Sequence, residues 1–169
     1  MMDVYFCFSF GRRESEPGLV NHEIATHVLL RLKKERGKGV LVKPYIASQW
    51  EVSDALQGLN IATEVRVELP HGASYIDTHN VARVMIRELA LHHDVTPREM
   101  RAVVFAHPLH IERCMVNLRG FGVKKFELVP TDELYDTQDM HPHVRSRSAF
   151  LRREPIARAC DRVRIMFAT

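Results

Sequence analysis

Residues 102–110 have the sequence Ala102-Val103-Val104-Phe105-Ala106-His107-Pro108-Leu109-His110, and this stretch decides the fold class. Its first five residues are apolar, which is typical of a strand buried on both faces, and the next apolar residues follow at helical spacing. The switch from strand to helix therefore puts His107, His110 and Arg113 beside the first turn of a helix. In an open parallel sheet, ligands bind at the carboxyl ends of the strands. The sequence thus predicts a functional site at this turn.

Segments with strand and helix patterns alternate along the rest of the chain. Aromatic and β-branched residues predict a central first strand at 4–10. The other strands are predicted at 39–47, 62–69, 102–106 and 125–130, with a last strand at 163–167. The helices are predicted from the N-cap Asn21 to Gly37, from Ser48 or Ser53 to Leu56, at 76–93, at 108–120 and at 146–161. This alternation predicts an α/β fold, with an open, mainly parallel sheet and helices on both faces.

The composition is that of one ordinary globular domain. With 169 residues, of which 46% are apolar, the chain predicts a single α/β domain over 1–169. It has no run of about 20 apolar residues, as a membrane span needs, and its start lacks a secretion signal, so we expect a cytoplasmic protein. The cysteines Cys7, Cys114 and Cys160 are odd in number and far apart, which predicts reduced thiols.

Charge is distributed unevenly, although the net charge is only +3. Five acids and no Lys or Arg lie between Glu127 and Asp139, whereas seven arginines lie between Arg145 and Arg164. Charge blocks often only solvate a surface, so a solvated helix beside an acidic loop is one interpretation. Arginine also binds phosphate and carboxylate well. The same helix is therefore a candidate surface for an acidic partner or a nucleic acid.

The strand-to-helix junction at 106–113, called the first junction below, allows three interpretations. His107 and His110 have a spacing that presents two imidazoles to one metal ion, with His141 or His143 as a further ligand, but no third ligand has firm spacing. The free N–H groups and positive end of the helix favour an anion site instead, with Arg113 one turn further in. In the third interpretation His107 only caps the end of the strand and His110 packs. The anion site needs nothing that the sequence lacks, so we favour it.

Two other strand ends carry polar residues. Asp77, Thr78 or Ser74 is predicted to cap the following helix, and this junction is expected at the same sheet edge as the first. Gly11-Arg12-Arg13 follows the first strand at the position of a phosphate-binding loop. It lacks the Walker lysine and the Gly-x-Gly-x-x-Gly pattern, and no Gly-x-Ser-x-Gly elbow occurs. The sequence therefore supports neither an NTPase, nor a dinucleotide enzyme, nor a serine hydrolase.

The segment 103–114 resembles the YdcF/SanA/ElyC family of bacterial proteins, a domain of unknown function. Its apolar strand, its short polar turn, and His110 and Arg113 are similar to the family's strand followed by His-x-x-Arg-Ala. The other matching residues are Glu68, Asp77, Thr78, Asn80 and Ala82 near the second junction, and Glu154 in a late Arg-x-Arg-Glu helix.

Two turns of the family take another form in this chain. Gly11-Arg12-Arg13 stands in place of a Gly-rich turn, and Ala47-Ser48-Gln49 stands in place of a Ser-Gly-Gly turn, after which Glu51 occupies the family's acidic position. The resemblance implies a three-layer, Rossmann-like fold with a polar cleft at the strand ends. Members are linked to envelope biogenesis and, in one branch, to S-adenosylmethionine. The residues name no cofactor, and the resemblance alone makes S-adenosylmethionine or a nucleotide a candidate.

The leading hypothesis is a protein that binds an anionic or phosphorylated small molecule at the strand ends, either as a binding protein or as an enzyme. Arg12, Arg113 and the helix N-termini hold the anion, and His110 or His107 acts as acid or base near neutral pH. The remaining ligand-binding residues of this hypothesis are Gly11, Ser48, Glu51, Asp77, Thr78 and Glu154. One alternative is a non-enzymatic interaction protein that uses the arginine-rich helix at 145–164, and another is a metal-dependent hydrolase that uses the histidines.

Overall fold

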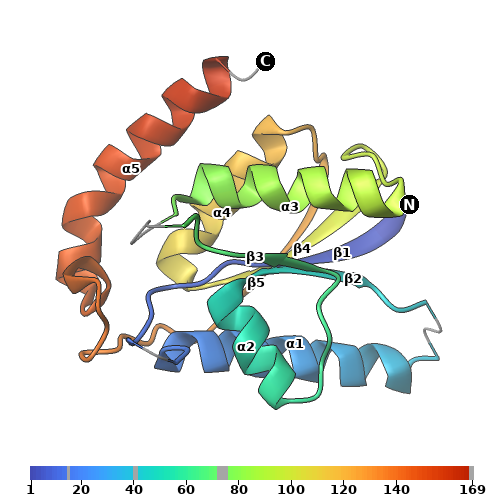
Figure 1. Cartoon of the computed structure of the whole chain (residues 1–169), viewed down its shortest axis with the longest axis horizontal. Helices are drawn as coiled ribbons and strands as arrows, with labels where there is room; N and C mark the ends of the chain where they lie inside the picture. Colours follow the sequence, from blue (N-terminus) through green and yellow to red (C-terminus); the bar gives the residue numbers. More distant parts are fainter. Residues whose placement is uncertain (15, 40–41, 72–75, 168–169) are drawn as a thin grey trace.

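The computed structural model describes residues 1–14, 16–39, 42–71 and 76–167, and its centre is a sheet of five parallel strands (Figure 1). The strands are β1 (Met2–Cys7), β2 (Tyr45–Gln49), β3 (Val65–Val67), β4 (Met100–Ala106) and β5 (Lys125–Pro130). Their order is β3-β2-β1-β4-β5, and every neighbouring pair is parallel. The chain builds outward from β1 to β3 and then crosses back to β4. Ligand crevices of open sheets lie at such a reversal, here between β1 and β4.

Helices cover both faces of the sheet (Figure 1). One face carries α1 (Leu19–Gly37) and α2 (Trp50–Gly58), and the other carries α3 (Thr78–His93) and α4 (Pro108–Gly120). A short 3-10 turn at Pro142–Val144 leads into α5 (Arg147–Phe167), which stands against one end of the sheet (Figure 1, red). The predicted three-layer α/β fold is confirmed, and the sheet is parallel throughout.

The central strands are buried on both sides. Val4 and Phe6 of β1 pack under α3 and α4, whereas Tyr5 and Cys7 pack against α1 and α2, because side chains alternate along a strand. All four side chains are fully buried. A strand between two helical layers needs apolar residues at every position, which explains the unbroken apolar run at 102–106.

Several predicted boundaries are corrected by the structure. β1 ends at Cys7 rather than at residue 10, and β3 is confined to Val65–Val67. β2 begins after Pro44, which has no N–H group to pair within a sheet; residues 40–41 of the predicted strand lie outside the described residues. α2 begins at Trp50, between the two predicted starts at Ser48 and Ser53.

The predicted last strand at 163–167 is wrong, because α5 continues through these residues. Helical spacing puts Glu154, Asp161 and Ile165 on the inner side of α5. Ile165 packs against Gly120 at the end of α4, where an added Cβ atom would lie 2.9 Å from Ile165 Cγ2. These packing contacts outweigh the strand preference of the β-branched residues.

The ends of two helices show which predicted caps are used. α1 begins at Leu19 with Gly18 as N-cap, so the prediction of Asn21 as N-cap is wrong. Asp136 stabilises this end instead, since its Oδ2 accepts a hydrogen bond from Leu19 N at 3.2 Å. Asp77 caps α3 by accepting from Asn80 N at 3.0 Å. Ser74, the other candidate cap, lies outside the described residues.

Substitution of Leu89 tests the buried layer formed by α3. Leu89 is fully buried, whereas Leu91 of the same helix is 69% exposed. We expect Leu89→Ala to lower the free energy of unfolding by about 2–5 kcal/mol because it leaves a cavity. Leu91→Ala should change it by less than about 0.5 kcal/mol. Urea denaturation measures both values, and equal effects would contradict this packing.

Candidate functional site

A pocket of about 310 Å³ lies at the carboxyl ends of the strands, beside the reversal between β1 and β4. Its walls come from the loop after β1, the end of β2, the connection from β3 to α3, and the first turns of α4. Residues of α5 and of the turn before it form the remaining wall. A volume of this size suits a small molecule.

Most of the predicted site residues meet in this pocket. Eight of the ten line it, namely Gly11, Arg12, Glu51, Asp77, Thr78, His110, Arg113 and Glu154. They are far apart in the sequence, but the carboxyl ends of parallel strands share one edge of the sheet. The junctions picked out from the sequence therefore belong to a single site.

The other two predicted residues, Ser48 and His107, lie behind the pocket wall. Ser48 is fully buried, and its hydroxyl lies 2.5 Å from that of Ser53. The His107 ring is also fully buried and stacks on Phe10, with 3.8 Å between the ring centres. Its Nδ1 accepts a hydrogen bond from Leu109 N at 3.3 Å, so His107 caps α4. Burial lowers the pKa of His107 to about 4, which makes it uncharged at neutral pH.

Asn21 and Asp139 shape the loop that carries Arg12. The buried amide of Asn21 accepts a hydrogen bond from Phe10 N at 3.0 Å and donates one to Gly11 O at 2.8 Å. Gly11 has a φ of +77°, a conformation that side-chain-bearing residues rarely adopt. A Cβ atom at Gly11 would lie 1.9 Å from Asp139 Oδ2. Glycine is therefore required here both by the backbone and by the close approach of Asp139.

Arg12 and Glu51 bring opposite charges to one wall of the pocket. The guanidinium carbon of Arg12 lies 5.7 Å from the ring centre of Trp50, which precedes Glu51 in α2. Arg12 Nε and Glu51 Oε2 are buried, and neither atom has a hydrogen-bond partner among the described residues. Buried polar atoms normally have partners. These two atoms therefore mark the part of the wall best suited to a polar ligand.

Burial perturbs two carboxyl groups near Arg12. It raises the pKa of Glu51 to about 7, and the charge of Asp139 adds to this shift. Burial also raises the pKa of Asp139 to about 6. Near neutral pH, Glu51 is thus divided between its neutral and ionised forms, which is the property that a general acid or base needs.

His110 is held in one tautomer. Arg113 Nη2 can only donate, so His110 Nδ1 accepts this hydrogen bond at 3.1 Å. Burial, with the charge of Arg113, lowers the pKa of His110 well below its ordinary value, so the ring is neutral and carries its proton on Nε2. Nε2 lies 3.5 Å from Thr78 Oγ1. Thr78 accepts from His110 and keeps its own hydroxyl hydrogen for another acceptor.

A buried polar cluster joins Arg113 of α4 to the inner side of α5. Arg113 is only 8% exposed. Its Nε lies 3.4 Å from Glu154 Oε1, and its Nη1 lies 3.9 Å from Asp161 Oδ2. Asn117 adds a hydrogen bond of 2.8 Å from its Nδ2 to Asp161 Oδ2. The guanidinium of Arg113 is therefore already bound to two carboxylates of α5.

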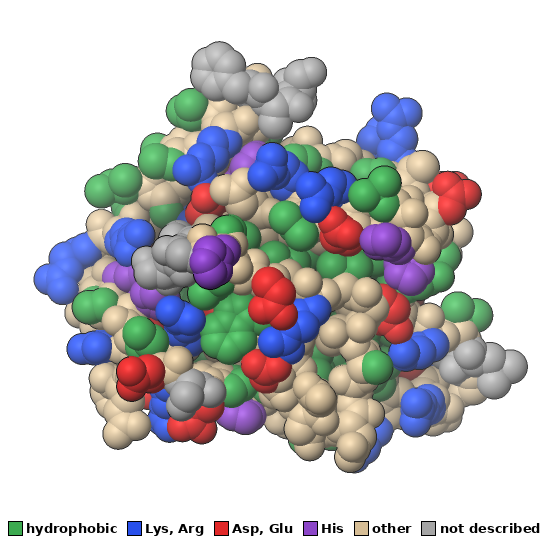
Figure 2. Space-filling model, in the orientation of Figure 1, with side chains coloured by type: hydrophobic (Ala, Val, Ile, Leu, Met, Phe, Trp, Pro, Cys, Tyr) green, Lys and Arg blue, Asp and Glu red, His purple; other side chains and the backbone are tan. Residues whose placement is uncertain are grey.

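Other ion pairs tie α5 to the rest of the protein. Arg164 donates to Asp77 Oδ2 at 2.8 Å, which joins the end of α5 to the start of α3 beside the pocket. Arg147 pairs with Glu133 in the loop after β5, and Arg158 pairs with Glu112 of α4. On much of the face shown in Figure 2, basic side chains lie beside acidic ones. Arg147, Arg158 and Arg164, three of the seven arginines at 145–164, thus form ion pairs with acids of their own chain.

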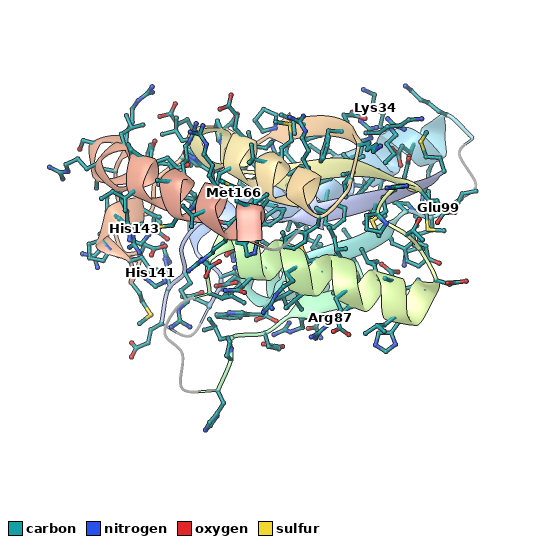
Figure 3. All side chains as sticks on the ribbon, turned by 90° about the horizontal axis from the view of Figure 1, so that it is seen from above. Lys34, Arg87, Glu99, His141, His143 and Met166 are labelled. Carbon is teal, nitrogen blue, oxygen red and sulfur yellow. The ribbon has the colours of Figure 1, made fainter. Side chains whose placement is uncertain are left out.

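His141 and His143 lie at the end of the sheet covered by α5, opposite Lys34 and Glu99 (Figure 3). Both line the pocket, and His143 Nδ1 lies 2.8 Å from Arg153 Nη1. Burial lowers the pKa of His143 to about 4. Within the described ranges, no group of three or more His, Cys, Asp or Glu residues is arranged to hold a metal ion. The metal hypothesis therefore gains no support from the histidines.

Sequence reasoning missed the acids that support the Arg12 loop. Asp136 and Asp139 belong to the acidic loop that the sequence predicts, and they are only 5% and 1% exposed. Asp136 Oδ2 accepts from Arg13 Nε at 2.8 Å. The pair Arg12-Arg13, which follows the predicted first strand, could have indicated these acids. Arginines close to a buried strand are rarely buried without acidic partners.

Comparison with known proteins adds no relatives. No protein-family model matches the chain. No curated protein and no solved structure matches it either. The resemblance to the YdcF/SanA/ElyC family therefore stays a prediction. Among the helices that the structure describes, none is long and apolar enough to cross a membrane.

Removal of Arg113 tests the buried cluster. We expect Arg113→Met to lower the free energy of unfolding by about 3–5 kcal/mol, because it leaves Glu154 and Asp161 buried without their cation. Arg119→Met changes an exposed arginine of the same helix and should cost less than about 1 kcal/mol. Chemical denaturation at neutral pH compares the two. A loss for Arg113→Met no larger than that of the control would rule out a structural role for the cluster.

Glu51→Gln tests the raised pKa of Glu51. The pKa of Glu51 is about 7 in the folded state and 4.5 ordinarily, so the folded state binds this proton more tightly than the unfolded state. The free energy of unfolding therefore falls as the pH rises from about 4.5 through 7. Glutamine mimics the neutral acid and removes this loss. We expect Glu51→Gln to be about 3 kcal/mol more stable than the wild type at pH 8 and equal to it at pH 4.

Denaturation midpoints at both pH values measure this difference. The control variant is Glu14→Gln, which removes an exposed carboxylate and should have no effect at either pH. A Glu51→Gln protein that is less stable than the wild type at pH 8 would show that ionised Glu51 stabilises the fold.

Proposed function

We propose that the pocket binds an anionic small molecule, either a phosphate monoester or a carboxylate, and that Arg12 binds its anionic group. The observation that carries this proposal is that Arg12 lines the pocket and its buried Nε has no hydrogen-bond partner among the described residues. Guanidinium N–H groups form strong, charge-assisted hydrogen bonds with phosphate and carboxylate oxygens. An anionic ligand would therefore supply the acceptor that Arg12 needs.

The other arginines of the pocket wall are occupied in different ways. Arg113 forms ion pairs with two carboxylates of α5, although its Nε, like that of Arg12, has no hydrogen-bond partner among the described residues. Arg164 is bound to Asp77. Arg153 donates to His143. We therefore assign the anion to Arg12 rather than to Arg113, and give Arg113 the role of orienting His110.

Three helix starts add to the attraction for an anion. α2, α3 and α4 all begin at the pocket, with Glu51, Thr78 and His110 in their first turns. The free N–H groups and dipoles of helix N-termini favour negative charge. The Asp77 carboxylate caps α3, and His107 Nδ1 caps α4, whose first residue Pro108 has no N–H group. The start of α2 has no side-chain cap, so it contributes most.

Glu51 is the best candidate for proton transfer if the bound molecule is also a substrate. Its pKa of about 7 suits an acid or base at neutral pH, whereas burial lowers the pKa of His107 and His110. S-adenosylmethionine or a nucleotide is a cofactor proposal that rests on the family resemblance alone. A nucleic-acid surface on α5 is less favoured, because several of its arginines are paired within the chain.

Arg12→Ala tests the proposed anion site. Titration of the wild-type protein with ethyl phosphate and with propionate, followed by NMR, should show saturable binding of at least one of them at the pocket. Loss of a charge-assisted hydrogen bond of about 1.5–3 kcal/mol should weaken that binding by about tenfold or more in Arg12→Ala.

The control is Arg83→Ala, which removes an exposed arginine of α3 and leaves the pocket unchanged. It should bind the probe as the wild type does. Absence of binding to the wild type, or equal affinity of Arg12→Ala, would refute the proposed function.

A further inference from the structure

We propose that the ligand carries a hydrogen-bond donor, an amine or a hydroxyl, close to its anionic group, and that Glu51 binds this donor. The inference rests on the proposed function, because Arg12 fixes the anionic end of the molecule. It narrows the ligand class from any small anion to small acids that also carry a donor.

Glu51 differs from the other carboxylates of the pocket wall. Asp77 is bound to Asn80 and Arg164, and Glu154 is bound to Arg158. Asp161 accepts a hydrogen bond from Asn117. By contrast, Glu51 is only 5% exposed, and although its carboxylate forms a hydrogen bond with the side chain of Ser9, no described residue offers a partner to its Oε2.

The position of Glu51 ties its partner to the anion site. The guanidinium of Arg12 lies over the ring of Trp50, the residue before Glu51, so the two charged side chains share one stretch of the wall. Their unpartnered atoms, Arg12 Nε and Glu51 Oε2, do not satisfy one another. A molecule that offers an acceptor to Arg12 and a donor to Glu51 would satisfy both.

The charge balance of the pocket points to the same class of ligand. The arginines of the wall are Arg12, Arg113, Arg153 and Arg164, and the acids are Glu51, Asp77, Glu154 and Asp161. Because the wall has as many acids as arginines, it does not favour a ligand that is negatively charged throughout. A ligand whose negative end lies at Arg12 and whose donor lies at Glu51 follows this arrangement.

Three probes of equal chain length separate the contribution of the donor from that of the anion: ethyl phosphate, 2-hydroxyethyl phosphate and 2-aminoethyl phosphate. Calorimetry gives the affinity of each for the wild type, Glu51→Leu and Glu51→Gln. We expect the wild type to bind at least one donor-bearing probe about tenfold more tightly than ethyl phosphate. Glu51→Leu should bind all three alike, whereas Glu51→Gln, which keeps an acceptor oxygen, should retain part of the preference.

Each outcome bears on one proposal. If only 2-aminoethyl phosphate binds more tightly than ethyl phosphate, the donor is an ammonium group. If 2-hydroxyethyl phosphate gains as much affinity, either donor serves. If the wild type binds ethyl phosphate as tightly as the other two probes, or if Glu51→Leu keeps the full preference, this inference is wrong while the anion site stands. If neither these phosphates nor propionate binds the wild type, the proposed function fails instead. Thermal unfolding of each variant confirms that it is folded.

Discussion

The buried guanidinium of Arg113 is the interaction on which the arrangement around the pocket depends. It is anchored in α4, faces Glu154 and Asp161 of α5, and donates to His110 Nδ1. Without a cation at this point, two carboxylates would be buried unpaired, and α5 would lose its main polar attachment to the core. The same group thus positions a helix and sets the tautomer of a pocket histidine.

This dual role changes the meaning of the most prominent motif in the sequence. His110 and Arg113 stand out as a pair, and they do meet in space, but they mostly interact with each other and with α5. Among the described residues, the buried polar atoms without a hydrogen-bond partner include Arg12 Nε in the loop after β1 and Glu51 Oε2 at the start of α2. The candidate binding chemistry therefore lies at strand ends other than the one that carries the His110 and Arg113 motif.

The sequence predicted the layers and the site location well, because both follow from local patterns. An apolar run such as 102–106 is typical of a strand between two helical layers, and parallel strands bring their polar ends together. Long-range contacts were not predictable in this way. The helical state of 163–167 depends on Ile165 meeting Gly120, and the burial of Asp139 depends on a glycine more than 120 residues away. Propensity and spacing carry no information on such pairings.

Cys160 gives this protein a natural attachment point beside the pocket. It is exposed and lines the pocket, whereas Cys7 and Cys114 are fully buried. Burial raises the pKa of both inner thiols, so they are poor nucleophiles as well as inaccessible. A maleimide dye would therefore label the wild-type chain at one position next to the candidate site, and occupancy of the pocket would be readable as a fluorescence change before any reaction is known.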